Sequence, residues 1–312
     1  MPAVSILVPV YNREYLIGEC IQSALAQTYS DFELVIIDNA SIDGTWKICQ
    51  KFSVADNRVR LFQNSTNIGP LKNIISGIKQ CKGKYIKILF SDDLLTSDCL
   101  EKSVAALELN PEGAMLIGNI YPLVNSQIIY RPLYRFDKER ISTDEYVNSV
   151  MFADAMPLSP GACLFRREDI ERNYKSDIQS PIDRKIEDHG AGPDLLSMLL
   201  TAARYDYICL MNQPVNIFRE HEGSLSISKS GKRLSDCYVQ AKVNFAVEYF
   251  SQSELRKVVA YIYTYRCVGY KEIISPLKFI KEFGLKLSNL EIILLKISIV
   301  KLVLRKIANK II

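Results

Sequence analysis

The chain has 312 residues, of which 48% are hydrophobic, and a formal net charge of +4. The hydrophobic fraction excludes a disordered chain, and the near balance of acidic and basic residues does not suggest a nucleic-acid binder. The 8 cysteines form no C-x-x-C pair, so neither a zinc knuckle nor a redox motif is indicated. The chain shows no secretory signal and no stretch of about 18 uninterrupted apolar residues, so we expect a cytoplasmic protein with reduced thiols.

The first part of the chain alternates between buried strands and helices. Strands are predicted from continuous apolar runs at 4–10, 32–38, 59–62 and 85–90. Helices are predicted between them at 15–27, 45–52 and 71–81. This alternation at short spacing is typical of βαβ units. We therefore predict an α/β fold with a Rossmann-like, mostly parallel sheet flanked by helices.

The pattern loosens after residue 94. Further helices are predicted at 99–109, 143–152 and 194–203, and further strands at 114–120, 127–130, 161–165 and 207–210. Residues 173–192 are polar and predict a long surface loop, which is a common place for function. A Ser-, Lys- and Gly-rich stretch at 225–233 predicts a boundary between a catalytic domain at 1–225 and a helical C-terminal region at 226–312.

Two adjacent carboxylates follow the predicted strand 85–90. Asp92 and Asp93 repel each other at that position, and folding alone gains little from the pair. A divalent cation takes oxygen ligands and often bridges carboxylates to substrate phosphates. Since ligands of open α/β sheets bind outside the carboxyl ends of strands, the pair predicts a metal–diphosphate site. The alternative is a turn and helix cap, where Asp is also favoured.

Asp38 is a second acid at a strand end. Its carboxylate would accept hydrogen bonds from a base N–H or from ribose hydroxyls, which predicts a nucleotide cradle together with Asp92. In the alternative, Asp38 is a turn residue and Ser41 or Asp43 caps the next helix. A nicotinamide dehydrogenase is disfavoured, because the turn at 9–12 lacks the glycines that let a backbone approach a pyrophosphate.

Four separated segments now agree in order and spacing with one known family. Residues 4–12, the Asp38 segment, 67–77 and 91–93 resemble the family-2 glycosyltransferases with a GT-A fold, and the likeness covers about 3–225. The resemblance implies a nucleotide-diphosphate sugar donor, most often a UDP sugar, with Mg²⁺ or Mn²⁺ as cofactor and inversion at the anomeric carbon. It also implies donor-binding residues at Pro9, Tyr11, Asn12, Asp38, Asn67, Gly69, Lys72, Ser91, Asp92 and Arg219.

The family's metal motif commonly reads Asp-x-Asp-Asp, and here it reads Phe-Ser-Asp-Asp from Phe90 to Asp93. By this resemblance Asp92 is the metal-binding acid, and Asp93 helps through water. The resemblance also places His221, two residues after Arg219, near the metal and the diphosphate. An imidazole can ligate a divalent cation, although a lone histidine is more often a surface or core residue.

The general base is implied at the start of the predicted helix 194–203. An inverting transfer needs a carboxylate that takes the proton of the acceptor hydroxyl, and Asp194 matches the base position of the family. Pro193 stands where the family usually has Glu. In the alternative, Asp194 is only an acid that suits a helix N-terminus. Asp188, in the Glu-Asp-His run at 187–189, is the second candidate for the base.

The tail at 287–312 combines Ile, Leu and Val with a basic stripe that includes Lys296, Lys301 and Arg305. Such a helix suits a membrane interface, or it packs on the catalytic domain or on a second subunit. We predict a metal-dependent inverting glycosyltransferase acting on a hydroxyl of a glycan or lipid-linked acceptor in bacterial surface polysaccharide synthesis, peripheral on the inner face of the cell membrane. A homo-oligomer is left open. The alternative is a non-catalytic, membrane-associated assembly subunit with a decayed donor pocket, because two of the family's acids are replaced.

Overall fold

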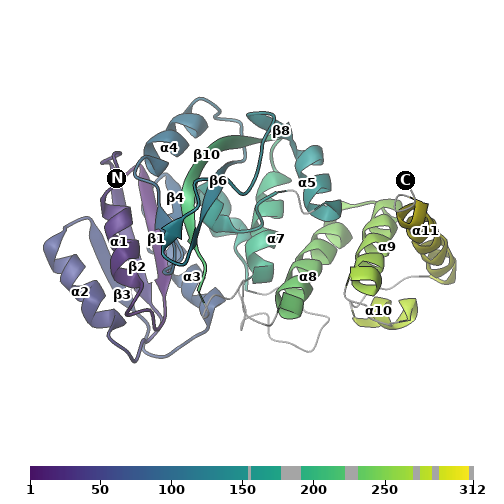
Figure 1. Ribbon diagram of the computed structural model, residues 1–312, viewed down its shortest axis with the longest axis horizontal. Helices are drawn as coiled ribbons and strands as arrows, with labels where there is room; N and C mark the ends of the chain where they lie inside the picture. The colour runs from purple at the N-terminus through teal and green to yellow at the C-terminus, as the bar shows by residue number, and fades with distance from the viewer. Residues whose placement is uncertain (154–155, 177–190, 222–230, 270–274, 283–287, 309–312) are drawn as a thin grey trace.

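A computed structural model describes residues 1–153, 156–176, 191–221, 231–269, 275–282 and 288–308. Within these residues the chain builds a central sheet with helices on both faces, and further helices extend from one end of the molecule (Figure 1). The predicted boundary near 225 and the greater part of the predicted loop at 173–192 lie outside the described residues.

The first half of the sheet is parallel. Its strands lie in the order β3-β2-β1-β4, and their bounds are β1 (Val4–Val10), β2 (Phe32–Asp38), β3 (Val59–Gln63) and β4 (Tyr85–Ile88). The connecting helices are α1 (Ile17–Leu25), α2 (Thr45–Ala55) and α3 (Pro70–Ile78). All seven residues of β2 are buried, as expected for a strand covered on both faces. The predicted βαβ pattern is confirmed in this half.

The second half of the sheet is mixed. The order continues β9-β6-β10-β5, with β7 on β6 and β8 on β10. The bounds are β5 (Leu94–Leu95), β6 (Met115–Val124), β7 (Gln127–Ile128), β8 (Arg140–Ser142), β9 (Cys163–Arg166) and β10 (Tyr207–Arg219). β6 and β10 pair parallel, whereas β9 runs antiparallel to both β4 and β6. The predicted parallel arrangement therefore holds for the first four strands, and antiparallel pairs join the sheet beyond β4.

Helices cover the two faces of the sheet as separate layers. The remaining elements here are α4 (Cys99–Glu108), α5 (Thr143–Phe152), the short 3-10 helix η1 (Pro160–Ala162), α6 (Arg167–Asn173) and α7 (Ala191–Ala202). α1, α2 and α4 pack on the face that carries Ile6 and Val8, and α3, α5, α6 and α7 pack on the face that carries Leu7. Successive strand residues point to opposite faces, so one strand supplies both cores.

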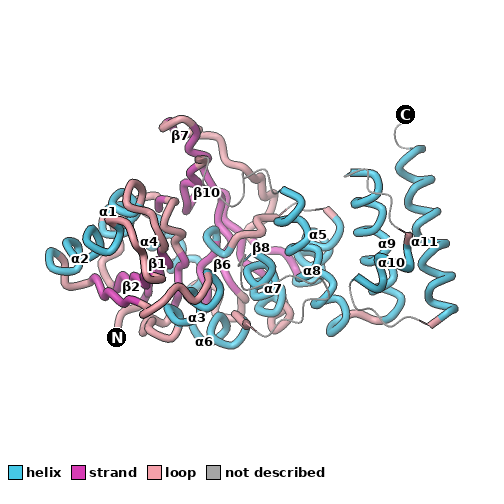
Figure 2. The backbone as a smooth tube through the Cα atoms, turned by 90° about the horizontal axis from the view of Figure 1, so that it is seen from below, coloured by secondary structure: helices cyan, strands magenta, loops and turns pink. Residues whose placement is uncertain are grey.

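Four helices form the C-terminal end: α8 (Gly231–Tyr249), α9 (Gln252–Gly269), α10 (Pro276–Glu282) and α11 (Asn289–Ala308). In both backbone views they lie at the end opposite α2 (Figures 1 and 2). α11 contacts α9, and Leu295 of α11 is buried in the same core as α7 and α9. Ile293, Ile297 and Val300 remain exposed on α11. Among the described helices, none has both the length and the apolar character of a membrane span.

Candidate active site

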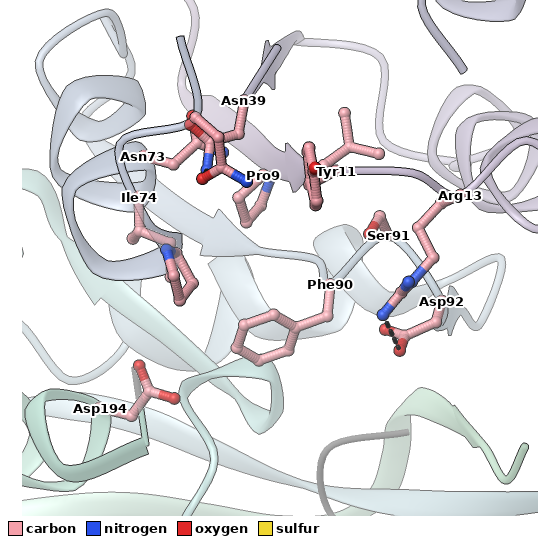
Figure 3. A pocket seen from close by; sticks show the side chains of 13 residues that line it. Pro9, Tyr11, Arg13, Asn39, Asn73, Ile74, Phe90, Ser91, Asp92 and Asp194 are labelled. Atoms are coloured by element: carbon pink, nitrogen blue, oxygen red, sulfur yellow. Dashed lines mark hydrogen bonds and ion pairs between the residues drawn. The ribbon is translucent and has the colours of Figure 1, made fainter. Parts of the chain in front are cut away.

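A cleft of about 300 Å³ opens at the carboxyl ends of β1, β2 and β4. The turns after these strands line the cleft, together with residues 67–74 at the start of α3 and Asp194 in the first turn of α7 (Figure 3). Six of the residues predicted from the sequence line it: Pro9, Tyr11, Asn67, Ser91, Asp92 and Asp194. Asp92 and Asp194 are 102 positions apart in the chain by their numbers, and the fold brings both to this cleft.

The turn after β1 is locked to the turn after β2. The backbone N–H of Asn12 donates to the Ser41 hydroxyl at 2.9 Å, and the Asn12 side-chain oxygen accepts from the N–H of Ile42 at 3.0 Å. The N–H of Arg13 donates to the Thr45 hydroxyl at 2.7 Å. Asn12 adopts a φ of 50°, a left-handed conformation that Asn tolerates better than most residues. The side chain of Asn12 thus holds the two turns together and does not line the cleft.

Asp38 is fully buried behind the cleft wall. One of its carboxylate oxygens accepts from the N–H of Ser41 at 3.1 Å and from the Gln63 amide at 2.8 Å, and the other accepts from the Ser41 hydroxyl. The next residue, Asn39, lines the cleft in its place. Ser41 and Gln63 occupy both carboxylate oxygens of Asp38, so contact of this residue with a nucleotide base stays a prediction.

Asparagine side chains connect β2 to the start of α3. The Asn39 amide donates to Asn67 at 2.8 Å, and the Asn64 amide donates to the side-chain oxygen of Asn73 at 2.8 Å. Asn73 also donates to the carbonyl of Ile37 at 3.1 Å. The buried amides of Asn39 and Asn73 take part in this network, which fixes the shape of the wall.

α3 begins at a glycine with a backbone that other residues avoid. Gly69 has φ 85° and ψ 157°, a region essentially restricted to glycine. Pro70 follows at the first helical position, where its missing N–H costs nothing. Gly69 therefore sets the direction of α3 at the cleft, and Lys72 lies exposed one turn further without lining it.

Asp92 is the acid at the open end of the cleft. Its Oδ2 lies 3.0 Å from Nε2 of His221 and 3.9 Å from the guanidinium of Arg13. The side chains of Asp92 and His221 are 21% and 22% exposed, so a ligand can reach both. A carboxylate oxygen and an imidazole nitrogen meet here, and this donor set fits a divalent ion that also takes substrate phosphates and waters as ligands.

The carboxylate of Asp93 is held by residues of β10 and does not line the cleft. It is 3% exposed, and its carboxylate accepts from the backbone N–H of Arg219 at 3.0 Å and from the Asn216 amide at 3.5 Å. Burial, followed by the nearby charge of Asp92, raises the pKa of Asp93 to about 8. Within the described part of the chain, no three His, Cys, Asp or Glu side chains gather as a metal-binding group. In this structure Asp93 therefore connects the turn after β4 to β10 by hydrogen bonds.

Arg219 also differs from the sequence-based expectation. Its guanidinium donates to Glu19 of α1 at 2.7 Å, and it does not line the cleft. β10 ends at Arg219, and His221 follows two residues later and contacts Asp92. Arg219 thus ties the end of β10 to α1 beside the site, and a contact with the diphosphate remains a prediction.

Asp194 faces the cleft from the first turn of α7. The hydroxyl of Tyr174 donates to its Oδ1. Burial raises the pKa of Asp194 to about 7, and the hydrogen bond from Tyr174 opposes that rise. A carboxylate with a pKa near neutrality is suited to taking up a proton. The rival candidate, Asp188, lies outside the described residues.

Several residues of the cleft were not predicted. Arg13, Asn39 and Asn73 supply polar groups, and Pro70, Ile74 and Phe90 supply an apolar part of the wall. Asn39 follows the predicted strand 32–38 and Phe90 ends the predicted strand 85–90, so the position of each in the sequence indicated the cleft. Asn73 lies in the segment 67–77 on which the resemblance to the family rests, and that segment was its signal.

The parallel half-sheet, the acid beside a histidine and the second acid across one cleft agree with the GT-A fold that the resemblance implied, with the ligand site outside the carboxyl ends of the strands. The family description "Glycosyl transferase family 2" matches residues 5–173. The chain therefore belongs to glycosyl transferase family 2.

Individual relatives agree with this assignment. Glycosyltransferase GlyG of Streptococcus pneumoniae is 33% identical over 118 residues, which span 38% of this chain and 39% of GlyG. Staphylococcus aureus TarS 1–349, solved with UDP-GlcNAc, has the same fold with a TM-score of 0.65 at 18% identity, covering 96% of this chain and 88% of TarS 1–349. The mannosyltransferase PcManGT of Pyrobaculum calidifontis, solved with GDP-Man and Mn²⁺, gives a TM-score of 0.51 at 17% identity over 91% of this chain and 79% of PcManGT.

Proposed function

We propose that this protein is a metal-dependent, inverting glycosyltransferase that moves a sugar from a nucleotide-diphosphate donor to an acceptor hydroxyl. The observation that carries this proposal is the shared cleft of Asp92 and Asp194. One acid stands beside an imidazole, a pair that could hold a metal ion against a diphosphate, and the other is a partly buried carboxylate with a raised pKa. The named ligands of the related folds, UDP-GlcNAc in TarS and GDP-Man in PcManGT, are donors of this class.

The turns after β1 and β2 are the proposed nucleotide side. Pro9 and Tyr11 offer apolar surface for a base, and Tyr11 is 38% exposed. Asn39 and Asn67 supply amide groups on the same wall, and Ser91 supplies a hydroxyl near Asp92. Because hydrogen bonds within the protein already fix Asn39 and Asn67, a donor would enter a preformed site with little ordering to do.

The reaction itself needs one proton acceptor. The acceptor oxygen forms a bond to C1 of the sugar, the bond from C1 to the diphosphate oxygen breaks, and the electron pair leaves with the nucleoside diphosphate. Asp194 takes the proton of the acceptor hydroxyl as that oxygen attacks. Tyr174 holds the carboxylate in place through its hydroxyl, which limits the orientations that Asp194 can adopt.

Asp92 and His221 are the residues that would hold a divalent metal ion. A bound Mn²⁺ or Mg²⁺ supplies Lewis-acid neutralisation of the leaving diphosphate. Asp92 keeps its carboxylate directed at the cleft, and its contacts with His221 and Arg13 hold it there. The imidazole nitrogen in this pair favours Mn²⁺ over Mg²⁺, since magnesium prefers oxygen ligands alone.

The acceptor and the cellular setting extend the same proposal. We infer a glycan or lipid-linked acceptor in surface polysaccharide synthesis, and a peripheral position on the inner face of the cell membrane. The exposed Ile293, Ile297 and Val300 on α11, with Lys296 between them, support contact with an anionic lipid surface.

The test is a donor screen with the purified chain. UDP, dTDP and GDP sugars are each supplied with Mn²⁺ and a mixture of glycan acceptors, and release of the nucleoside diphosphate is measured with and without chelator. We expect metal-dependent release from at least one donor. Asp92→Asn is expected to lower that release by about 10²-fold, since even residues outside the immediate ligands cost 10- to 100-fold when changed.

Asp98→Asn is the matched control, because Asp98 is an acid paired with Lys102 on α4. It should leave release unchanged. Release from no donor, together with metal-dependent stabilisation by UDP in a thermal shift, would favour the assembly subunit with a retained pocket. Release that ignores both the chelator and the Asp92→Asn substitution would contradict the proposed role of the metal.

A further inference from the structure

The middle of the cleft is apolar. Phe90 follows the end of β4, Pro70 starts α3, and Ile74 lies one helical turn after Pro70. All three line the cleft, and in the close view the Phe90 ring lies between the carboxylates of Asp92 and Asp194 (Figure 3). Phe90 stands at the motif position where an acid is common in the family, so hydrogen-bonding capacity is replaced here by an aromatic ring.

The proposed reaction fixes what must occupy this space. C1 of the donor sugar has the leaving oxygen on one side and the attacking hydroxyl on the other. The proposed function places the leaving group at Asp92 and the attacking hydroxyl at Asp194. A sugar ring that spans these two acids lies against the wall that contains Phe90. This inference rests on the proposed function and adds the chemical class of the sugar to it.

The Phe90 ring is supported from behind by η1. A Cβ added at Gly161 would come within 3.3 Å of the ring, so the backbone of η1 and the ring are in close contact. The carbonyl of Gly161 accepts a hydrogen bond from Nζ of the buried Lys87 at 2.5 Å, which anchors η1 to β4. The ring therefore has no room to withdraw toward η1 when a sugar enters.

We propose that Phe90, with Pro70 and Ile74, selects an uncharged donor sugar that bears a methyl group, as an acetamido or a 6-deoxy sugar does, and rejects uronic acids. Contact of a methyl group or of a C–H face of the sugar with the ring and the two aliphatic side chains removes apolar surface from water, which favours binding. They offer no partner to a sugar carboxylate, whose transfer from water to this wall would be uncompensated.

The experiment compares donors that share a nucleotide and differ in one group. kcat/KM is measured for UDP-GlcNAc, UDP-glucose and UDP-glucuronic acid, and for GDP-6-deoxy-D-mannose against GDP-D-mannose if GDP donors are the ones turned over. We expect the methyl-bearing donor to exceed its partner by about 10-fold or more, the scale on which small apolar groups are discriminated. Phe90→Asp is expected to remove that preference, and Phe90→Leu, which keeps an apolar side chain, to retain most of it.

Phe62→Leu is the control, since Phe62 is a partly buried ring on β3 away from the cleft. It should leave the donor ratio unchanged. Phe90→Asn provides a second polar variant if Phe90→Asp does not fold. A wild-type preference for the uronic acid, or an unchanged ratio in the folded polar variant, would overturn this inference and leave the proposed function intact. Release from no nucleotide sugar by the wild type would instead refute the proposed function.

Discussion

The two sides of the cleft are built on different principles. On the side of β1, β2 and α3, the polar groups are joined to one another, as in the contact of Asn39 with Asn67 and that of Asn73 with Asn64. On the side of β4, α7 and β10, acids sit in apolar or like-charged surroundings, and the pKa values of Asp93 and Asp194 are raised to about 8 and 7. On the first side, the polar groups are hydrogen-bonded to one another. On the second side, the surroundings of the acids shift their pKa values.

This contrast separates binding from chemistry. A preformed polar wall lowers the cost of ordering a donor and has little reason to alter the chemical step. A partly buried carboxylate does the opposite, since desolvation adjusts its affinity for a proton. Substitutions on the two sides should therefore change different kinetic constants, and the following variants test that separation.

The largest effect is expected for Asp194→Asn. The amide cannot take the proton of the acceptor hydroxyl, so kcat should fall by about 10²- to 10⁴-fold while the affinity for the donor stays nearly constant. Single-turnover sugar transfer and donor binding by calorimetry measure the two quantities. Asp169→Asn is the control, because Asp169 accepts a hydrogen bond from Tyr205 at 2.6 Å as Asp194 does from Tyr174, yet lies outside the cleft. A kcat within tenfold of wild type would remove Asp194 from the base role.

Asn73→Ala should act on the other side of the cleft. It removes one of the two side-chain acceptors of the Asn64 amide and the side-chain donor to the carbonyl of Ile37, which is expected to lower the free energy of unfolding by about 1–3 kcal/mol and to raise the KM for the donor. Urea denaturation and donor titrations test both effects. Asn119→Ala removes an equally buried amide, bonded to Tyr134 on the second half of the sheet, and should cost similar stability with no change in KM. A fall in kcat as large as that of Asp194→Asn would end the distinction between the two sides.

The smallest effect concerns pH. Asp194 works as a carboxylate, so kcat should rise with pH through about 7, where this group loses its proton. The Tyr174 hydrogen bond lowers the pKa of Asp194, and Tyr174→Phe removes it, so the acidic limb of the pH–rate profile should move to higher pH. Tyr205→Phe makes the same change at the Asp169 pair and should leave the profile in place. If the acidic limb of the Tyr174→Phe profile stays at the wild-type pH or moves to lower pH, a group other than Asp194 controls it.

The sequence was most informative where one local signal decided the structure. β2 has the predicted bounds because five of its seven residues are apolar and four of these are consecutive, a pattern typical of a strand covered on both faces. β10 was predicted only at 207–210 and extends to Arg219, since Asn212, Gln213 and Pro214 interrupt its pattern at an irregular part of the pairing with β6. β10 continues through this interruption because its pairing with β6 shifts register there, and the local sequence pattern does not indicate such a shift.

The candidate site shows the same limit. Asp38 ends β2 and Asp92 follows β4, as the apolar runs predicted. The direction in which each acidic side chain points depends on residues far away in the sequence. Gln63 of β3 and Ser41 engage Asp38, and the backbone of Arg219 engages Asp93. Only the assembled fold brings those partners close, so position was predictable and orientation was not.

The interlocked turns after β1 and β2 have a consequence for engineering and for descent. Each turn completes the hydrogen bonds of the other, through Asn12 with Ile42 and Arg13 with Thr45. A chimaera that takes one of these turns from a relative would leave hydrogen-bond donors and acceptors of the other turn without partners. The two segments should therefore be exchanged, and inherited, as a single cassette, although α1 and β2 separate them in the chain.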